Sequence, residues 1–80
     1  MNTYKVFVGV TARFEPDGKI IPLSVLWEDG RTFEIDKILD VRRAASLKAG
    51  GAGIRYTVRI GRRETFLFLE EGRWFAQRRD

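Results

Sequence analysis

Four tight-turn signals divide this chain into short segments, and they constrain the fold more than any other feature of the sequence. They are PDGK (16–19), EDGR (28–31), IGRR (60–63) and EEGR (70–73). Each places a glycine where a tight turn needs a positive φ angle, and a basic residue follows it. The runs between the signals have the length and composition of β-strands, so the pattern predicts a mostly β protein.

Two alternating runs open the chain. In residues 3–14, every second residue falls on one largely apolar side, which comprises Tyr4, Val6, Val8, Val10, Ala12 and Phe14. This period of two indicates a half-buried strand, and Gly9 can mark a bend in it. In residues 20–28, one face carries Ile21, Leu23, Val25 and Trp27. Pro22 cannot donate a ladder hydrogen bond, which indicates a sheet edge or a bulge at that end.

Residues 37–49 allow two interpretations. Asp36 can cap a helix that stops at Gly50, or residues 37–43 can form a strand with Leu39 and Val41 facing inward and a bulge near Asp36. The strand, followed by an irregular segment, is the favoured interpretation. The helix would bury only a weak apolar stripe, because one of its positions is the small residue alanine.

The C-terminal part contains three further strand candidates. Residues 54–60 alternate, residues 64–69 are almost wholly apolar, and Trp74 and Phe75 begin a last short strand. A strand that is apolar on both faces is covered on both sides or lies in a subunit contact. The sequence therefore predicts a single domain over residues 1–80, a small antiparallel SH3-like or related barrel of five to seven short strands. One short helix within residues 37–49 is the alternative there.

The absence of cysteine and histidine restricts the chemistry of this chain. Disulfides, thiolate nucleophiles, the commonest general base and the commonest transition-metal ligand are all excluded. Asp36 and Asp40 can be considered as an acid/base or Mg²⁺ pair, but no third carboxylate clusters with them. The favoured interpretation is that Asp36 caps or kinks the chain and Asp40 pairs with an arginine two or three residues later. We therefore expect no enzyme activity, no cofactor and no metal. The lack of a long apolar stretch predicts a cytoplasmic protein without membrane contact.

The glycine-rich stretch SLKAGGAGIR (46–55) does not match a nucleotide-binding loop. It lacks both the Walker pattern and the third glycine of a dinucleotide fingerprint, and it leads into a strand rather than a helix. The backbone N–H groups near Gly50, Gly51 and Gly53 can form an anion nest flanked by Lys48 and Arg55. A plain connection between two strands is the favoured interpretation.

Basic residues provide the leading functional hypothesis. The net charge is +4, and the candidate binding residues are Arg42, Arg43, Lys48, Gly50, Gly51, Gly53, Arg55 and Arg59. They form a patch if Arg42 or Arg43 pairs beside Arg55, and exposed phenylalanines on the same face would add base stacking. Surface salt bridges to Glu34, Asp36 or Asp40 are the alternative, and they are the favoured interpretation of these arginines. The leading hypothesis is a non-enzymatic module that contacts nucleic acid or an acidic protein partner.

An assembly role is the alternative function. The apolar C-terminal hairpin would then mediate homodimer formation or docking on a larger protein, through Phe66, Phe68, Trp74 and Phe75.

Residues 27–60 also carry a resemblance. The W-x-D-G-R turn, the segment D-V-R-R-A-A-S-L-K-A-G-G-x-G-x-R-Y and the aromatic C-terminal hairpin resemble a group of small uncharacterised proteins of Gram-positive bacteria, a family of unknown function. The resemblance implies a small bacterial β protein and brings no catalytic residues.

Overall fold

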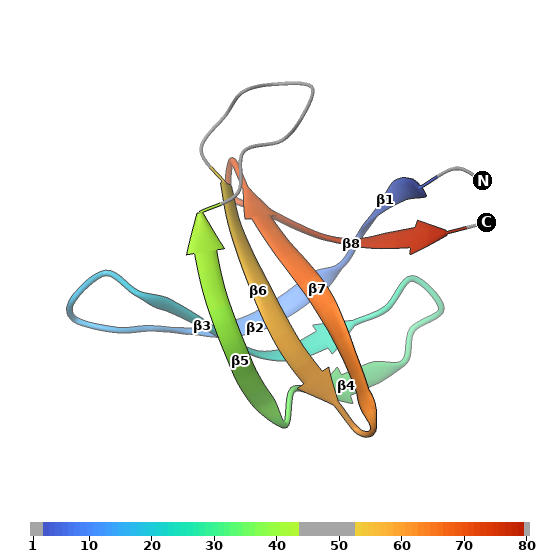
Figure 1. The fold of residues 1–80 in the computed structure, drawn as a ribbon, viewed down its shortest axis with the longest axis horizontal. Coiled ribbons are helices and arrows are strands. Elements are labelled where there is room, and N and C mark those ends of the chain that lie inside the picture. Colours follow the sequence, from blue (N-terminus) through green and yellow to red (C-terminus); the bar gives the residue numbers. More distant parts are fainter. Residues whose placement is uncertain (1–2, 44–52, 80) are drawn as a thin grey trace.

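The computed structural model describes residues 3–43 and 53–79, which form eight β-strands (Figure 1). No helix, and hence none able to cross a membrane, occurs in these two ranges. The strands are β1 (Thr3–Phe7), β2 (Gly9–Phe14), β3 (Ile20–Leu26), β4 (Thr32–Glu34), β5 (Lys37–Arg43), β6 (Gly53–Ile60), β7 (Arg63–Glu70) and β8 (Arg73–Arg79). The mostly β fold predicted from the turn signals is confirmed.

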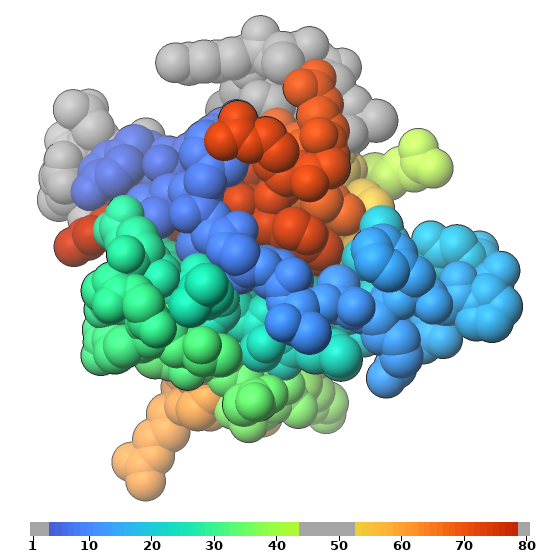
Figure 2. Space-filling view, turned by 180° about the vertical axis from the view of Figure 1, so that it is seen from behind, coloured from blue at the N-terminus to red at the C-terminus, as the bar shows by residue number. Residues whose placement is uncertain are grey.

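The strands form two antiparallel sheets. One has five strands in the order β1-β8-β7-β6-β5, and the other has three in the order β2-β3-β4. Figure 1 shows β5, β6 and β7 of the five-stranded sheet in front, and Figure 2 shows β2, β3 and β4, coloured light blue to green, on the opposite side. The predicted barrel is not closed, because β8 pairs with β7 over only four residues and then continues beside β1.

The chain passes from the five-stranded to the three-stranded sheet at Val8 and back again between β4 and β5. The first passage divides the predicted run 3–14 into two strands, so eight strands form rather than five to seven. Val8 separates β1 from β2 and donates its N–H to the Trp74 carbonyl at 3.1 Å. Between β4 and β5, the Ile35 N–H donates to Leu23 of the three-stranded sheet and the Asp36 N–H to Arg59 of the five-stranded sheet, both at 2.9 Å. Neighbouring residues thus hydrogen-bond to different sheets.

Glycine and proline mark the irregular points of β2 and β3. A side chain at Gly9 would place its Cβ 3.3 Å from the Leu26 Cβ, so the absence of a side chain permits close approach at the predicted bend. Pro22 is buried and pairs with Ala12 where the register between β2 and β3 shifts, as its missing N–H predicts.

Residues 37–43 form a strand, so the helix alternative is wrong for this range, and residues 44–49 lie outside the described residues. The bulge lies at Leu39, between Ile38 and Asp40, rather than near Asp36. Val41 is opposite the buried Tyr56 but is 53% exposed, because β5 is an edge strand and little covers it.

The four turn signals have the predicted backbone geometry. Their glycines adopt φ angles of 90°, 90°, 62° and 76° in chain order. Glu71, in the last turn, is the non-glycine residue with positive φ (51°) among the described residues. That conformation is uncommon for a residue with a side chain and is mildly strained.

The core lies between the two sheets. Its buried centre comprises Val25 of the three-stranded sheet and Tyr56, Val58 and Leu67 of the five-stranded sheet. The Tyr56 hydroxyl donates a hydrogen bond to the Ile20 carbonyl at 2.6 Å, which links the sheets directly. Burial raises the pKa of Tyr56 because the ionised phenol would be poorly solvated.

Candidate nucleic-acid interface

Five side chains form one row across the outer face of the five-stranded sheet. The strand register aligns them from β1 to β5 in the order Phe7, Phe75, Phe68, Arg55 and Arg42, which we call the transverse row. Side chains alternate across a sheet, and the intervening Tyr56 and Leu67 belong to the core. The row therefore lies on the face of the five-stranded sheet that points away from the core.

The aromatic part of this face is continuous. The ring centroids of Phe7 and Phe75 lie 5.9 Å apart in an edge-to-face arrangement, and those of Phe75 and Phe68 lie 4.9 Å apart in a parallel stack. Phe66 extends the group, 6.4 Å from Phe68. We call these four residues the aromatic platform. Phe75 is 3% exposed, whereas Phe7 and Phe66 are 46% and 43% exposed, so accessible rings lie at both ends.

Cationic groups lie over these rings. The guanidinium carbon of Arg73 is 3.7 Å from the Phe7 ring centroid, and that of Arg55 is 4.7 Å from the Phe66 centroid. Lys5 Nζ lies 4.5 Å from the Phe75 centroid. Each exposed cation–π contact contributes about 0.5–1 kcal/mol. A guanidinium held over a ring can itself present a surface on which a nucleobase stacks.

Arg55 has an unfilled hydrogen-bonding requirement. Its Nε atom is buried and has no hydrogen-bond partner within the described part of the chain. A buried donor without an acceptor costs on the order of 1–3 kcal/mol, and more when the group is charged. A phosphate oxygen could reach this atom only if the neighbouring side chains moved aside.

The structure brings some of the predicted binding residues together. Arg42 lies directly opposite Arg55, which meets the condition for a basic patch. Arg59 lies on the same face, opposite Lys37, with its guanidinium 3.7 Å from Glu64.

Other predicted binding residues lie elsewhere. Arg43 pairs with Ile54, on the alternate face of the sheet, and so does not join the patch. Gly53 is buried at the start of β6. Lys48, Gly50 and Gly51 lie outside the described residues, so the anion nest stays a prediction.

The two aspartates act as the favoured interpretation predicts. Asp36 accepts a hydrogen bond from the Gly61 N–H at 2.6 Å, where the chain changes sheets. Asp40 accepts from Arg42 Nε at 2.7 Å, two residues along β5. The Arg42–Asp40 pair is exposed and contributes about 0–1 kcal/mol, so a phosphate can replace Asp40 at little cost. No group of three carboxylates suited to a metal ion occurs within residues 3–43 and 53–79.

The aromatic residues predicted for a dimer contact differ in exposure. Trp74 packs against the core, with its ring centroid 5.4 Å from that of Tyr56, and Phe75 is covered on the outer face. Phe68 is half-buried, and Phe66 is exposed. A contact through this hairpin would therefore rely mainly on Phe66.

Sequence analysis missed Lys5 and Arg73. Lys5 shares a side of its strand with Phe7, which was a usable signal. Arg73 was interpreted only as the residue after a turn, and its contact with Phe7 depends on the pairing of β1 with β8.

No protein-family model, no curated protein and no solved structure matches this chain. The resemblance to small proteins of Gram-positive bacteria stays a prediction.

Proposed function

We propose that the outer face of the five-stranded sheet binds single-stranded nucleic acid without catalysing a reaction. Bases stack on the accessible ends of the aromatic platform, and Arg42, Arg55 and Arg59 neutralise phosphates. The transverse row carries this proposal, because it sets stacked phenyl rings directly beside arginines on one face. That combination of ring faces and cations is how many sheets bind unpaired nucleotides.

The charge of this face supports a polyanionic ligand. Among the side chains that the structure describes, the register and the cation–π contacts place six cationic residues and three acidic ones on it. The cationic residues are Lys5, Lys37, Arg42, Arg55, Arg59 and Arg73, and the acidic ones are Asp40, Glu64 and Glu70. A single strand is favoured over a duplex because only unpaired bases can stack on protein rings.

The expected affinity is modest and sensitive to salt. Base–aromatic stacking contributes about 1–3 kcal/mol per base, and the platform has two accessible rings. Adding two or three phosphate contacts predicts a Kd of about 1 to 100 μM at low salt.

The stacking part of the proposal is tested by fluorescence anisotropy with fluorescein-labelled dT and U dodecamers in 50 mM NaCl. Phe7→Leu and Phe66→Leu keep an apolar side chain but remove the ring. We expect each variant to weaken binding by about five- to twentyfold, the loss of one stacked base. Phe14→Leu is the matched control, because Phe14 is 74% exposed but lies in the three-stranded sheet. If neither dodecamer binds, or if all three variants bind alike, the proposal is wrong.

The phosphate contacts are tested by repeating the titration from 50 to 200 mM NaCl. Arg55→Gln should lower the slope of log affinity against log salt by about 0.7, the value for one phosphate contact to a single strand. Arg13→Gln is the control, because Arg13 lies on β2 and pairs with Glu15. Equal slopes for the two variants would exclude Arg55 from the interface.

Self-association is the second candidate, since exposed Phe7 and Phe66 also suit a contact between copies. Light scattering at the concentrations of the titration separates the two functions. A mass that falls from dimer to monomer in Phe66→Leu, without nucleic-acid binding by the parent chain, would favour assembly.

A further inference from the structure

β7 and β8 separate halfway along β7. They pair from Leu67 opposite Ala76 to Glu70 opposite Arg73, after which β8 continues beside β1. Residues 63–66 pair with β6 on one side and with no described strand on the other. These four residues are exposed, and burial begins at Leu67, where β8 joins. A four-residue length of β7 edge is therefore open to pairing.

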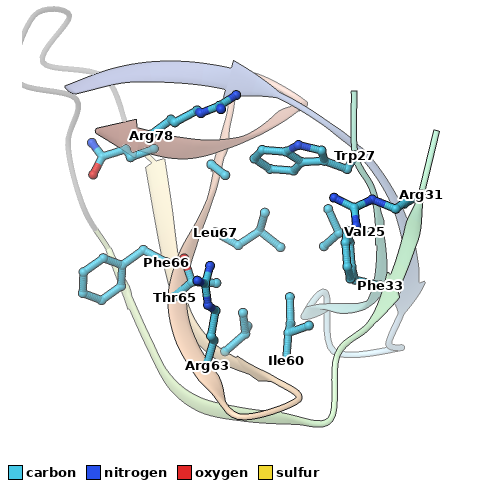
Figure 3. Close-up of a pocket in the computed structure, with 13 residues that line it drawn as sticks. Val25, Trp27, Arg31, Phe33, Ile60, Arg63, Thr65, Phe66, Leu67 and Arg78 are labelled. Atoms are coloured by element: carbon cyan, nitrogen blue, oxygen red, sulfur yellow. The ribbon is translucent and has the colours of Figure 1, made fainter. Parts of the chain in front are cut away.

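A cavity of about 530 Å³ lies in the angle between the diverging strands (Figure 3). Its apolar lining comes from both sheets and from the turn after β3, and includes Val25, Trp27, Phe33, Val58, Ile60 and Leu67. Figure 3 shows Trp27 and Phe33 across the cavity from Leu67, while the Phe66 ring points away from it. The volume lies within the range of about 300–1,000 Å³ typical of ligand pockets, and the cavity is half open to solvent.

The cavity is lined by three arginines and by no acidic residue of the described chain. Arg31 and Arg78 pair with Asp29 at 2.7 Å and Glu28 at 3.2 Å, and neither acid lines the cavity. Arg63 makes no ion pair with any described residue. Exposed ion pairs contribute about 0–1 kcal/mol, so an incoming carboxylate can replace them.

We propose that this split binds an extended peptide, which adds as a strand to residues 63–66 of β7. The peptide carries an apolar and an acidic residue two positions apart. Side chains alternate along a strand, so every second peptide side chain enters the cavity. Arg63 and Thr65 share the inward face of β7 with Leu67 and line the cavity. The acidic residue therefore lies opposite Arg63, and the apolar residue lies opposite Thr65.

A peptide fits better than a small amphiphilic anion because the open edge and the cavity coincide. A small anion would use the arginines and the apolar lining but not the backbone N–H and C=O groups of residues 63–66. The cavity lies on the inner side of the five-stranded sheet and the aromatic platform on its outer side. Failure of one proposal therefore leaves the other standing.

The test begins with a selection of random octapeptides displayed on phage, using the full chain as the target. We expect enrichment of sequences with an apolar and an acidic residue at positions i and i+2. The enriched peptide is then synthesised and titrated while tryptophan fluorescence is recorded in a Trp74→Phe background, in which Trp27, which lines the cavity, is the only tryptophan of the sequence. Arg63→Gln should weaken binding about tenfold, the effect of losing one charge-assisted hydrogen bond. Arg62→Gln, in the adjacent turn, is the matched control and should bind normally.

Backbone pairing has its own readout. Methylation of alternate peptide amides removes the donors needed for strand addition and should abolish binding. The proposal is overturned if the selection enriches nothing or if methylated peptides bind as tightly as unmodified ones. It is also overturned if Arg63→Gln leaves the peptide affinity unchanged while its melting temperature shows that the variant is folded. Binding of decanoate without binding of any selected peptide would also overturn it and would identify a small-anion site.

Discussion

The hydrogen bond between Tyr56 and Ile20 offers a direct test of how the two sheets are held together. Tyr56→Phe removes only the hydroxyl that donates to the Ile20 carbonyl at 2.6 Å. A net hydrogen bond contributes about 0.5–1.5 kcal/mol, and a buried carbonyl left without its donor raises the cost toward about 3 kcal/mol. Ile20 is half-buried, so water can reach its carbonyl in part. We expect a loss of about 1–2 kcal/mol in the free energy of unfolding.

Urea unfolding followed by tryptophan fluorescence measures this loss. The midpoint should fall while the denaturant slope stays constant, because the surface exposed on unfolding is unchanged. For a domain of this size, the melting temperature should fall by about 5 to 15 °C.

A pH series adds a second readout for the same pair of proteins. Burial raises the pKa of Tyr56 in the folded state above 10.0, the usual value for tyrosine. The parent chain therefore keeps this contribution to stability below pH 10 and loses it as the pH rises through the folded-state pKa. Phenylalanine cannot ionise, so the difference between the two proteins should shrink above pH 10. Equal midpoints at pH 7, or a difference that grows above pH 10, would refute the reasoning.

Three further perturbations test the core, one turn and one ion pair. Val58→Ala, at a fully buried site, should cost about 2–3 kcal/mol in urea unfolding, whereas Val41→Ala on the exposed edge should cost under about 0.5 kcal/mol. Glu71→Asn should raise stability by about 0.5–1 kcal/mol in thermal melts, because asparagine tolerates the positive φ at this turn position, and a lower melting temperature would contradict the strain. A hydrogen bond from the Arg31 backbone N–H lowers the pKa of Asp29, and the Arg31 guanidinium lowers it further. The parent chain should therefore be more stable than Asp29→Asn above pH 3.8, and the two melting temperatures should converge as acid protonates the folded carboxyl.

The strands and turns were predictable because their determinants are local. A positive φ at glycine and a period of two along the chain depend on a few adjacent residues, and both appear in the structure as predicted. The passage of a run from one sheet to the other was not predictable, because it does not depend on adjacent residues alone. Alternation continues through Val8, so the period of two shows a bend at most and does not reveal that the partner strand changes.

The inward face of β5 was mispredicted for a related reason. The bulge at Leu39 inserts one residue into the ladder, and its position depends on the facing strand β6. Val41 stays exposed because cover from the opposite sheet is a property of the whole fold.

For the candidate interface, the sequence predicted which residues would have to be neighbours but not whether the fold makes them neighbours. The sequence predicts a patch only if Arg42 or Arg43 lies beside Arg55 and phenylalanines share their face, and the register meets both conditions. It could not separate Arg42 from Arg43, because the two point to opposite faces and the register decides which one joins the patch. Phe7 and Phe75 become neighbours through the pairing of β1 with β8, and no local pattern encodes that pairing.

The pairing of β1 with β8 also ties the interface to the order of synthesis. β1 is synthesised first among the described strands, and residues 75–79, which pair with it, belong to the strand that is synthesised last among them. An incomplete chain that stops before Phe75 already contains Arg42, Arg55 and Phe68 but lacks the ring that joins Phe7 to Phe68. Such a fragment has the charge of the interface without its continuous stack. Under the proposed function, we therefore expect such a fragment to bind nucleic acid more weakly than the chain that contains β8, because it lacks the stacking contribution of the joined rings.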